Sequence, residues 1–550
     1  MQGNQNAIWR ADTSGPVLRD VTIAELLAEK ARRHPDRPAF SFRDGDTAIR
    51  WSYSELHSKV SHLAKALVAL GVAQGERVGV LSPNCPDWLL LEYALGYVGA
   101  VLVTLNPALK SEEIRYIARQ GRLSGMFTAQ MYRGSEVGVA AATATADENA
   151  DPDFRFLVEL GSTRFEEMLA GASRISDAEL AERVAAVKPG DVFQIQYTSG
   201  TTGKPKGAML THHSTINNAT LMSYRAGFGP DDVLLSAMPL FHTAGCVCNA
   251  LGMLAVGGHF ITVPGFDAEQ MLDLVEQEKA TVINAVPTMW QRMLEDERLK
   301  SGARDVASLR VAFTGGTSIP PSLMRQVKQT FGADPMLIMG MTECSPIITQ
   351  TDPDDDFEVK ISTAGTPLPH TEVQIVDPES GAPVAFGEAG ELLIRGYLVT
   401  KGYFDMPDRT TEAFDADGWF RSGDLAVLNE AGYLRIVGRI KDMLIRGGEN
   451  VYPVEIEDFL LTHPGIAEAQ VVGVPNDELG EEIYAFVVIK PDVQITPEDV
   501  QAFCRAGIAR HKMPRYVECM DALPMTANGK IKKFELRQIA ARNVQNRGAV

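Results

Sequence analysis

The segment from 197 to 207, Tyr-Thr-Ser-Gly-Thr-Thr-Gly-Lys-Pro-Lys-Gly, limits what this chain can fold into more than any other stretch. It holds four Ser or Thr hydroxyls, three glycines and two lysines. Glycine permits a positive φ, so that backbone N–H groups can converge on one point and bind an anion. A β-rich stretch precedes it, and a helix start with Thr211 and Ser214 as caps follows Leu210. We therefore expect a phosphate-binding loop between a strand and a helix. The expected phosphate-binding residues are Thr198, Ser199, Gly200, Thr201, Thr202, Gly203, Lys204 and Lys206.

Two other interpretations of this segment are weaker. Surface turns are also rich in Gly, Ser and Thr, but the density of donors here argues against an ordinary turn. A Walker P-loop needs four residues between its glycines and a Ser or Thr after its lysine. Here two residues separate Gly200 from Gly203, and Pro205 follows Lys204. The spacing excludes the Walker motif.

Length and charge narrow the class of protein further. A chain of 550 residues exceeds a single hydrophobic core, so at least two domains are expected. A net charge of −19 argues against nucleic acid as a partner and implies that an anionic substrate meets a local basic site. The six cysteines show no Cys-x-x-Cys pair, which predicts free thiols in a reducing compartment. Without a signal core or a long apolar run, we expect a cytoplasmic protein with no membrane span.

The order of predicted elements indicates the fold class. Strands alternate with helices over 77–105 and again over 233–339, which predicts parallel sheets flanked by helices. Short strands rich in Gly and Pro over 362–428 predict a β-barrel-like subdomain. Beyond Gly438 the pattern predicts a small α+β domain. Residues 136–152 lack periodicity and are expected to form a solvated insertion. The expected fold is thus α/β, with a large N-terminal domain and a small C-terminal one.

The phosphate-loop segment closely resembles that of the adenylate-forming superfamily. This group comprises acyl- and aryl-CoA synthetases, adenylation domains of peptide synthetases and luciferases. Five further motifs resemble the superfamily in the same order, and together the resemblance covers roughly 22–541. It implies a C-terminal domain that acts as a lid. The expected domains are 1–438 and 442–550, joined by a hinge at 439–441.

Two of these motifs concern the nucleotide. Residues 339–343, Met-Gly-Met-Thr-Glu, resemble an aromatic-Gly-x-Thr-Glu motif in which the Thr contacts the α-phosphate and the Glu holds Mg²⁺. A carboxylate beside phosphates is repelled unless a cation lies between them, so a bound metal ion is consistent with this motif. Met339 stands where an aromatic ring stacks on adenine, and a thioether can also lie on a π-face. Residues 315–318, Gly-Gly-Thr-Ser, resemble the segment that lies between adenine and the acyl group. The resemblance implies Mg²⁺ ligands Glu343 and Thr201, and nucleotide contacts from Gly315, Gly316, Thr317, Met339, Gly340, Met341 and Thr342.

Three motifs lie toward the C-terminus. Residues 420–424 resemble a motif whose Asp, here Asp424, accepts hydrogen bonds from the ribose hydroxyls. Arg439 would also reach the ribose, and Lys441 would be the pivot of the hinge. Residues 524–530 resemble a motif whose lysine, here Lys530, bridges the carboxylate and the α-phosphate. Residues 447–453 resemble the loop that lines the pantetheine tunnel, which implies contacts with coenzyme A from Gly447, Gly448 and Glu449.

The implied reaction has two steps. A carboxylate attacks the α-phosphate of Mg·ATP, and the thiol of coenzyme A then attacks the acyl-AMP. The expected catalytic residues are Lys530, Thr198, Glu343 and His242.

The substrate is narrowed by the segment 240–245, which contains His242 but no acid to pair with an amine. Burial of an unpaired ammonium is costly, so amino acids are disfavoured. The small residues around Gly245 leave room for an apolar tail, and residues 286–289 resemble the fatty-acyl type. We expect a medium- or long-chain fatty acid, with aryl or short thioether acids as alternatives. An acyl-AMP ligase that loads a carrier protein, a non-catalytic nucleotide-binding relative and a homo-oligomer remain open.

Overall fold

A computed structural model shows how the chain folds. It describes residues 6–13, 15–45, 47–146, 153–198, 204–316, 319–447, 449–476, 479–491, 493–525 and 531–548. By its internal contacts the chain divides into two compact units. The larger comprises Trp9–Val373 and Ile394–Phe420, and the smaller comprises Met1–Ile8, Gln374–Leu393 and Arg421–Val550. No helix among the described residues is long and apolar enough to cross a membrane.

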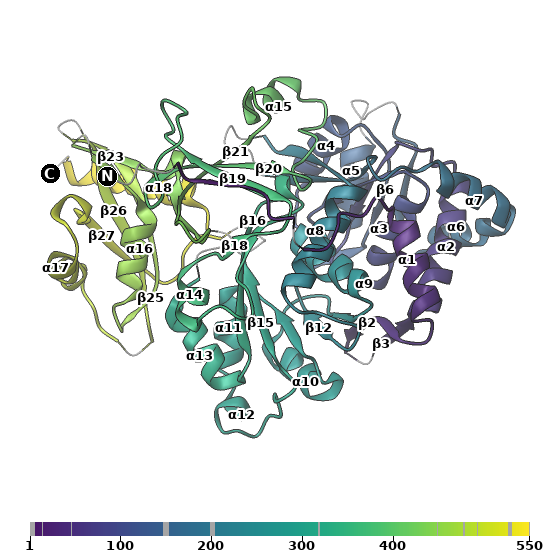
Figure 1. The fold of residues 1–550 in the computed structure, drawn as a ribbon, viewed down its shortest axis with the longest axis horizontal. Helices are drawn as coiled ribbons and strands as arrows, with labels where there is room; N and C mark the ends of the chain where they lie inside the picture. The colour runs from purple at the N-terminus through teal and green to yellow at the C-terminus, as the bar shows by residue number, and fades with distance from the viewer. Residues whose placement is uncertain are drawn as a thin grey trace. The chain divides into compact units, whose positions relative to one another are not determined.

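The first sheet of the larger unit has six strands in the order β11-β10-β5-β4-β6-β9. Its strand β6 is labelled in Figure 1. Neighbours from β10 to β9 run parallel, and β11 pairs antiparallel with β10. Its strands are β4 (Arg77–Leu81), β5 (Val101–Leu105), β6 (Leu123–Thr128), β9 (Phe156–Glu159), β10 (Val192–Thr198) and β11 (Lys206–Thr211). Helices α4 (Ser111–Gln120) and α5 (Val137–Thr145) pack on one face, whereas α2 (Tyr53–Ala69) and α3 (Pro86–Tyr97) pack on the other.

The second sheet of the larger unit has nine strands in the order β18-β17-β16-β15-β14-β12-β13-β2-β3. Neighbours from β16 to β2 run parallel. Its strands are β2 (Pro38–Asp44), β3 (Thr47–Ser52), β12 (Val233–Ser236), β13 (His259–Thr262), β14 (Val282–Asn284), β15 (Val311–Gly315), β16 (Asp334–Gly340), β17 (Ile347–Gln350) and β18 (Thr366–Pro367).

Successive side chains of this sheet enter two different cores. Leu234 faces a core shared with α8 (His212–Arg225) and α9 (Gly252–Val256), whereas Leu235 faces one shared with α10 (Ala268–Glu278), α11 (Pro287–Leu294) and α13 (Pro321–Phe331). A strand buried on both faces requires apolar residues at consecutive positions, which is why these strands lack polar alternation. The expected parallel sheets flanked by helices are confirmed.

Helix starts follow local capping rules. The expected helix at 22–34 is α1 (Ile23–Arg33), and Thr22 and Glu25 form a capping box at its start. Thr211 forms the corresponding box with Ser214 at the start of α8. These helix starts were predictable because the capping bonds join residues three apart in the sequence.

Strands β19, β20 and β21 of the predicted barrel-like segment join β1 and β22 in a five-stranded sheet in the order β1-β19-β20-β21-β22. They are β1 (Ile8–Trp9), β19 (Thr371–Val376), β20 (Ala389–Gly396), β21 (Phe420–Leu428) and β22 (Leu434–Arg439). The outer strands of this sheet are β1 and β22.

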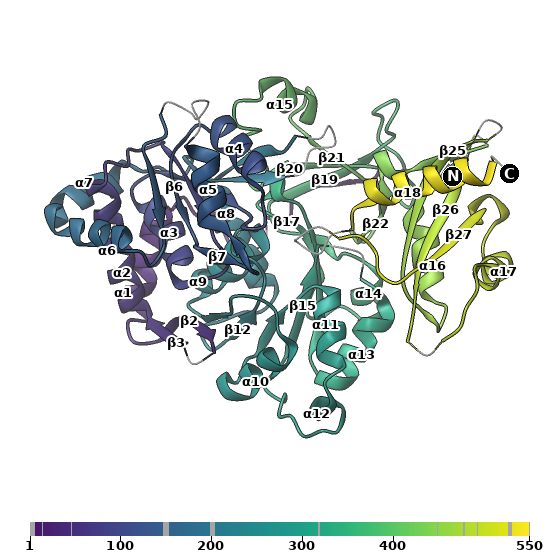
Figure 2. The ribbon, with the colours of Figure 1, turned by 180° about the vertical axis from the view of Figure 1, so that it is seen from behind.

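The C-terminal part of the smaller unit is an α+β fold (Figure 2). Its sheet has the order β24-β23-β26-β25, with β27 also paired to β26. Helices α16 and α17 pack into one core, and α18 packs into another. The elements are β23 (Leu444–Arg446), β24 (Glu449–Val451), α16 (Pro453–Leu461), β25 (Ile466–Asn476), β26 (Gly480–Ile489), α17 (Pro497–Gly507), β27 (Tyr516–Met520) and α18 (Lys533–Gly548).

Two local predictions were wrong. The segment expected to be a solvated insertion contains α5, in which Val137, Ala141 and Ala144 are buried. Their spacing of four and three residues places them on one face of a helix. The side chains of this segment are small, so its composition resembles that of a loop. The phosphate loop does not lead from a strand directly into a helix. It joins β10 to β11 in an antiparallel hairpin, and α8 begins after β11.

Candidate active site

The two ends of the phosphate loop meet at the end of the β10–β11 hairpin. Thr198 is the register partner of Lys206 across the two strands. The phenol of Tyr116, on α4, donates a hydrogen bond to the carbonyl oxygen of Pro205 at 3.0 Å, and the Lys204 ammonium lies 5.8 Å from the centre of the Tyr116 ring. Ser199, Gly200, Thr201, Thr202 and Gly203 lie outside the described residues.

Lys206 lies against an aromatic ring that comes from much later in the chain. Its ammonium is 4.1 Å from the centre of the Tyr403 ring, within the range of a cation–π contact. Burial lowers the pKa of Lys206, and the nearby Glu343 carboxylate opposes this shift. Residues 401–404 run along β11, where Lys401 and Phe404 donate backbone hydrogen bonds to Met209 and Gly207. The Lys206 side chain, which extends from β11, therefore packs against the segment that carries Tyr403.

Glu343 connects this hairpin to the second sheet. It lies in a short 3₁₀ turn, Thr342–Cys344, just after β16, and only 6% of its surface is exposed. Its Oε1 accepts hydrogen bonds from Thr198 Oγ1 at 3.3 Å and from the Tyr403 hydroxyl at 3.0 Å. Burial, followed by the Glu343 charge, raises the pKa of Tyr403, so this phenol remains a donor. The structure thus brings together two motifs that lie 145 residues apart in the sequence.

Two glycines allow close backbone packing where β15 and β16 end. A Cβ on Gly315 would lie 2.4 Å from Ile338 Cγ1, and one on Gly340 would lie 2.2 Å from the carbonyl oxygen of Pro346. Both distances are impossible contacts, so neither position tolerates a side chain without movement of its neighbours. Gly316 follows with a φ of +82°, and Thr317 lies outside the described residues. Met339, Met341 and Thr342 are partly exposed beside these glycines.

The turn that contains His242 begins where β12 ends. The His242 amide donates to the Pro239 carbonyl at 3.1 Å, and Nδ1 of His242 accepts from the Ala244 amide at 3.3 Å. A Cβ on Gly245 would lie 2.1 Å from the Pro239 carbonyl oxygen. The space beside Gly245 is therefore occupied by the turn itself. The expectation that the small residues around Gly245 leave room for an apolar tail stays a prediction.

A π-helix, Ala244–Leu251, continues from this turn into α9. Gln196 Nε2, on β10, donates to Cys246 Sγ at 3.3 Å and so links the π-helix to the strand that leads to the phosphate loop. π-Helical segments are rare and frequently occur at functional sites.

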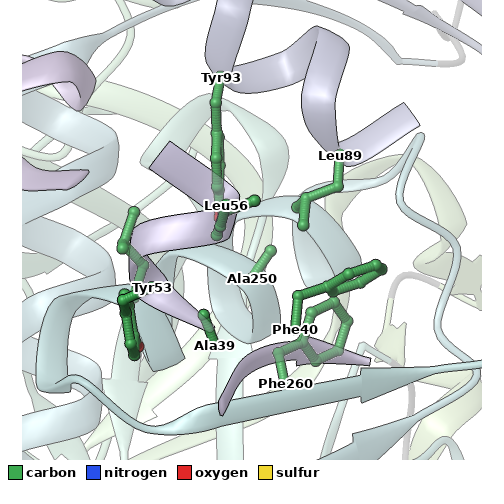
Figure 3. A pocket seen from close by; sticks show the side chains of 9 residues that line it. Ala39, Phe40, Tyr53, Leu56, Leu89, Tyr93, Ala250 and Phe260 are labelled. Atoms are coloured by element: carbon green, nitrogen blue, oxygen red, sulfur yellow. The ribbon is translucent and has the colours of Figure 1, made fainter. Parts of the chain in front are cut away.

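Behind the π-helix is a cavity of about 10 Å³ (Figure 3). Ala250 borders it together with the aromatic rings of Phe40, Tyr93 and Phe260. A single water needs about this much space. The cavity is a gap in core packing and has no room for an acyl chain.

The smaller unit holds the motifs expected to contact ribose and coenzyme A. Asp424 and Arg439 face each other across β21 and β22, and Arg439 Nε donates to Asp424 Oδ1 at 2.9 Å. Burial lowers the pKa of Lys441, and Arg439 acts in the same direction. Gly447 has a φ of +61°, and the exposed Glu449 lies 3.2 Å from His511. Gly448 and Lys530 lie outside the described residues.

The acidic groups present can be tested against a magnesium ion. Among the described residues, no three His, Cys, Asp or Glu side chains are arranged to hold a metal ion. Mg²⁺ is commonly bound by one or two carboxylates together with substrate phosphates, so a site completed by a nucleotide needs few protein ligands. A buried carboxylate, Glu343, beside the phosphate-loop hairpin fits that requirement.

Sequence reasoning missed Tyr403 and Tyr116. Tyr403 contacts both Glu343 and Lys206, and Tyr116 contacts Lys204 and Pro205. The only local signal for Tyr403 is the glycine directly before it, Gly402, which does not indicate a partner 60 residues away. Contacts of this kind depend on the packing of several segments.

A buried acid and a lysine at the β10–β11 hairpin, an Asp–Arg pair and a separate α+β domain are the features that the motifs of adenylate-forming enzymes predicted. Comparisons with known proteins agree. The AMP-binding enzyme family matches residues 27–404, and the AMP-binding enzyme C-terminal domain matches residues 455–530. YngI of Bacillus subtilis (strain 168), assigned by name to the acyl-CoA synthetases, is 40% identical over 94% of this chain and 96% of its own length.

Two further relatives support the same class. The mitochondrial medium-chain acyl-CoA ligase ACSF2 of Mus musculus is 35% identical over 95% of this chain and 88% of its own length. ATP-bound MatB from Rhodopseudomonas palustris superposes with a TM-score of 0.83 at 30% identity, over 94% of this chain and 99% of that one. The chain belongs to the AMP-binding enzymes and is an ATP-dependent acyl-CoA synthetase, an acid–thiol ligase.

Proposed function

We propose that this enzyme activates a medium-chain fatty acid. Relatives named medium-chain acyl-CoA ligases are similar over nearly the whole chain. The turn 240–245 offers no acid for an amino group. The similarity to these relatives carries the choice of acid. The adenylation chemistry is supported by the contact of Thr198 and Tyr403 with Glu343, which brings an acid, hydroxyl donors and Lys206 together at the phosphate-loop hairpin.

In the first step a carboxylate oxygen forms a bond to the α-phosphorus of ATP while the bond to pyrophosphate breaks. Lys204, Lys206 and the loop hydroxyls hold the phosphates, which concentrates positive charge where negative charge collects. Mg²⁺, when held through Glu343 and Thr201, would offset part of the phosphate charge. Lys530 bridges carboxylate and α-phosphate, and His242 borders the carboxylate.

In the second step the sulfur of coenzyme A forms a bond to the acyl carbon, AMP leaves, and the thiol proton is released. Asp424 and Arg439 hold the ribose throughout. Lys441 is the pivot between the domains 1–438 and 442–550, and Gly447, Gly448 and Glu449 line the path of pantetheine. A reducing, cytoplasmic location completes the proposal, because all six cysteines are free.

The test is pyrophosphate release across a graded series of straight-chain fatty acids, with aryl and short thioether acids beside them. We expect a maximum of kcat/KM at medium chain length and an acyl-CoA product that requires coenzyme A. A maximum with aryl acids would contradict the proposed substrate. Acyl-AMP that accumulates with coenzyme A present and is consumed by a carrier protein would instead identify the ligase that loads such carriers.

A further inference from the structure

Asn84 is a buried side chain in the loop between β4 and α3, and it bonds to two neighbouring strand ends of the second sheet. Only 3% of its surface is exposed. Its Nδ2 donates to the carbonyl oxygens of Met238 and Val263 and to Thr262 Oγ1, each at 3.1 Å, and its Oδ1 accepts from the Leu240 amide at 2.7 Å. One carboxamide thus joins the loop after β4 to the segments that follow β12 and β13.

The residues that Asn84 holds lead directly into the turn of His242. The His242 amide donates to the Pro239 carbonyl at 3.1 Å, and the Gly245 amide donates to the His242 carbonyl at 2.9 Å. A Cβ on Gly245 would lie only 2.8 Å from the Leu240 nitrogen, so the turn is packed closely on this part of the backbone. Because these contacts leave no free space, a shift of Leu240 would carry His242 with it.

The link made by Asn84 connects two different sheets. Strand β4 belongs to the first sheet, in which β5 separates it from β10, the strand that leads to the phosphate loop. The turn of His242 follows β12 of the second sheet. Other bonds at the end of β12, from Ser236 Oγ to the Asn284 carbonyl and from Thr262 Oγ1 to the Ser236 carbonyl, stay within the second sheet. Asn84 therefore helps to set the position of His242 relative to the first sheet.

We propose that Asn84 is a positioning residue that fixes the His242 turn relative to the sheet that carries the phosphate-loop hairpin. This inference rests on the proposed function, in which His242 borders the carboxylate and the hairpin holds the phosphates. The carboxylate oxygen has to meet the α-phosphorus at close range and in the right direction, so a small displacement between the two sheets slows adenylation. In this role Asn84 acts through His242 and not on the reacting atoms.

An amide suits this position because one planar group supplies both the N–H donors and the acceptor that the site requires. Removal of the amide leaves the buried carbonyls of Met238 and Val263 without this donor, which also lowers stability. The effect on the reaction must therefore be separated from the effect on folding. A double-mutant cycle with His242 makes this separation, because only an effect that passes through His242 depends on the presence of its side chain.

The experiment measures kcat/KM for a medium-chain acid by pyrophosphate release in the full-length protein. Asn84→Ala should lower kcat/KM by about tenfold or more, while the KM for ATP changes by less than about twofold. In the His242→Ala background the same substitution should change kcat/KM by less than about twofold. Asn84→Ser, which keeps a hydroxyl, should recover part of the activity, and it takes the place of Asn84→Ala in the cycle if that variant does not fold.

Asn217 provides the matched control. It is 1% exposed, its Nδ2 donates to the Arg19 carbonyl at 2.9 Å, and its Oδ1 accepts from the Arg19 amide at 2.7 Å. Asn217→Ala therefore also removes a buried carboxamide that bonds to the backbone, but at a different place in the larger unit. It should lower the midpoint of thermal unfolding and leave kcat/KM for the acid within about twofold of wild type.

The outcomes separate this inference from the proposed function. Equal losses from Asn84→Ala in both backgrounds overturn the positioning role alone, and so does an unchanged kcat/KM in the folded variant. A comparable loss in Asn217→Ala also overturns it, because the cause is then a general loss of stability. If His242→Ala matches wild type, the proposed place of His242 beside the carboxylate is wrong, and this inference fails with it. A wild-type enzyme that releases no pyrophosphate with any acid overturns the proposed function and every inference that rests on it.

Discussion

Thr198 Oγ1 donates a hydrogen bond to Glu343 Oε1 across 3.3 Å, between the last residue of β10 and the turn that follows β16. These strands belong to different sheets of the larger unit. The bond therefore fixes the phosphate-loop hairpin relative to the Thr-Glu motif. Tyr403 donates to the same carboxylate oxygen, so Glu343 is the residue at which three separate segments meet.

Replacement of Glu343 by Gln keeps the shape of this side chain and removes its charge. We expect adenylation to slow by at least about 10²-fold, the scale of losing one strong electrostatic contact, and the apparent Mg²⁺ affinity to fall. The measurement is pyrophosphate release over a range of Mg²⁺ concentrations. Unchanged activity at limiting Mg²⁺ would show that Glu343 has no role in metal binding.

Two substitutions of Tyr403 separate its two contacts. Tyr403→Phe removes the hydroxyl that bonds to Glu343 but keeps the ring beside Lys206, and a hydrogen bond to a charged group is worth roughly tenfold or more in rate. Tyr403→Leu also removes the cation–π contact, worth about 0.5–2 kcal/mol. We expect a stepwise fall in the adenylation rate, with Leu below Phe. Tyr224→Phe, at a position that is 59% exposed, serves as the control. Equal rates for Phe and Leu would mean that the ring of Tyr403 contributes nothing through Lys206.

Met339 provides a test of how adenine is held. Its side chain is partly exposed on β16, and it is the register partner of Thr349 on β17. An aromatic ring should stack on adenine better than a thioether by about 0.5–1.5 kcal/mol. Met339→Tyr should therefore lower the KM for ATP by roughly two- to tenfold. Unchanged or poorer ATP affinity would indicate that the base lies away from this side chain.

The proposed alternation of the C-terminal lid between the two half-reactions can be tested by measuring each half-reaction separately. Lys530→Ala should lose acyl-AMP formation yet still convert supplied acyl-AMP to the thioester, because the lysine charge is needed only while carboxylate and phosphate approach each other. Lys441→Pro fixes φ at the pivot and should form acyl-AMP but transfer it slowly. Single-turnover kinetics measures each half. If both variants slow both halves equally, alternation of the lid is the wrong mechanism.

His212 predicts a loss of stability in mild acid. Burial lowers its pKa from 6.5 to about 4, its ring stacks on Phe193 at 4.6 Å, and Nδ1 accepts a hydrogen bond from the Ile23 amide at 3.4 Å. A base with a depressed pKa in the folded state is protonated more readily when unfolded. The stability that neutral His212 contributes is therefore present above pH 6.5 and is lost as the pH falls toward 4.

Denaturant unfolding checks this prediction. Between about pH 7 and about pH 5 the penalty from His212 should reach on the order of 2 kcal/mol, at about 1.4 kcal/mol for each pH unit below the unfolded pKa. His212→Asn retains an acceptor for the Ile23 amide and does not titrate, so its loss between the two pH values should be smaller by that amount. An identical loss in variant and wild type would mean that His212 is not the titrating group.

Sequence patterns determined the features that depend on residues close together in the chain. The capping box of Thr22 and Glu25 positions α1 through bonds that span three residues. The alternation of strands and helices indicated parallel sheets, because a parallel strand pair requires a long crossover. The motif order identified the family, since six short patterns in one order seldom arise by chance.

Tertiary structure decided the features that depend on distant partners. The strand β11 exists because Lys206–Thr211 pairs with β10, and nothing in its own composition distinguishes it from a loop. The burial of α5 follows from its packing against α4, which the small side chains of that helix did not reveal.

The active-site contacts show the same division most clearly. The sequence alone predicted that Thr198, Lys206 and Glu343 belong to nucleotide-binding motifs, because glycine, hydroxyl and charge patterns are local. Only the tertiary structure placed Tyr403 beside both Lys206 and Glu343. The physical reason is that a side-chain contact depends on distance in space, and folding brings together residues 60 positions apart in sequence.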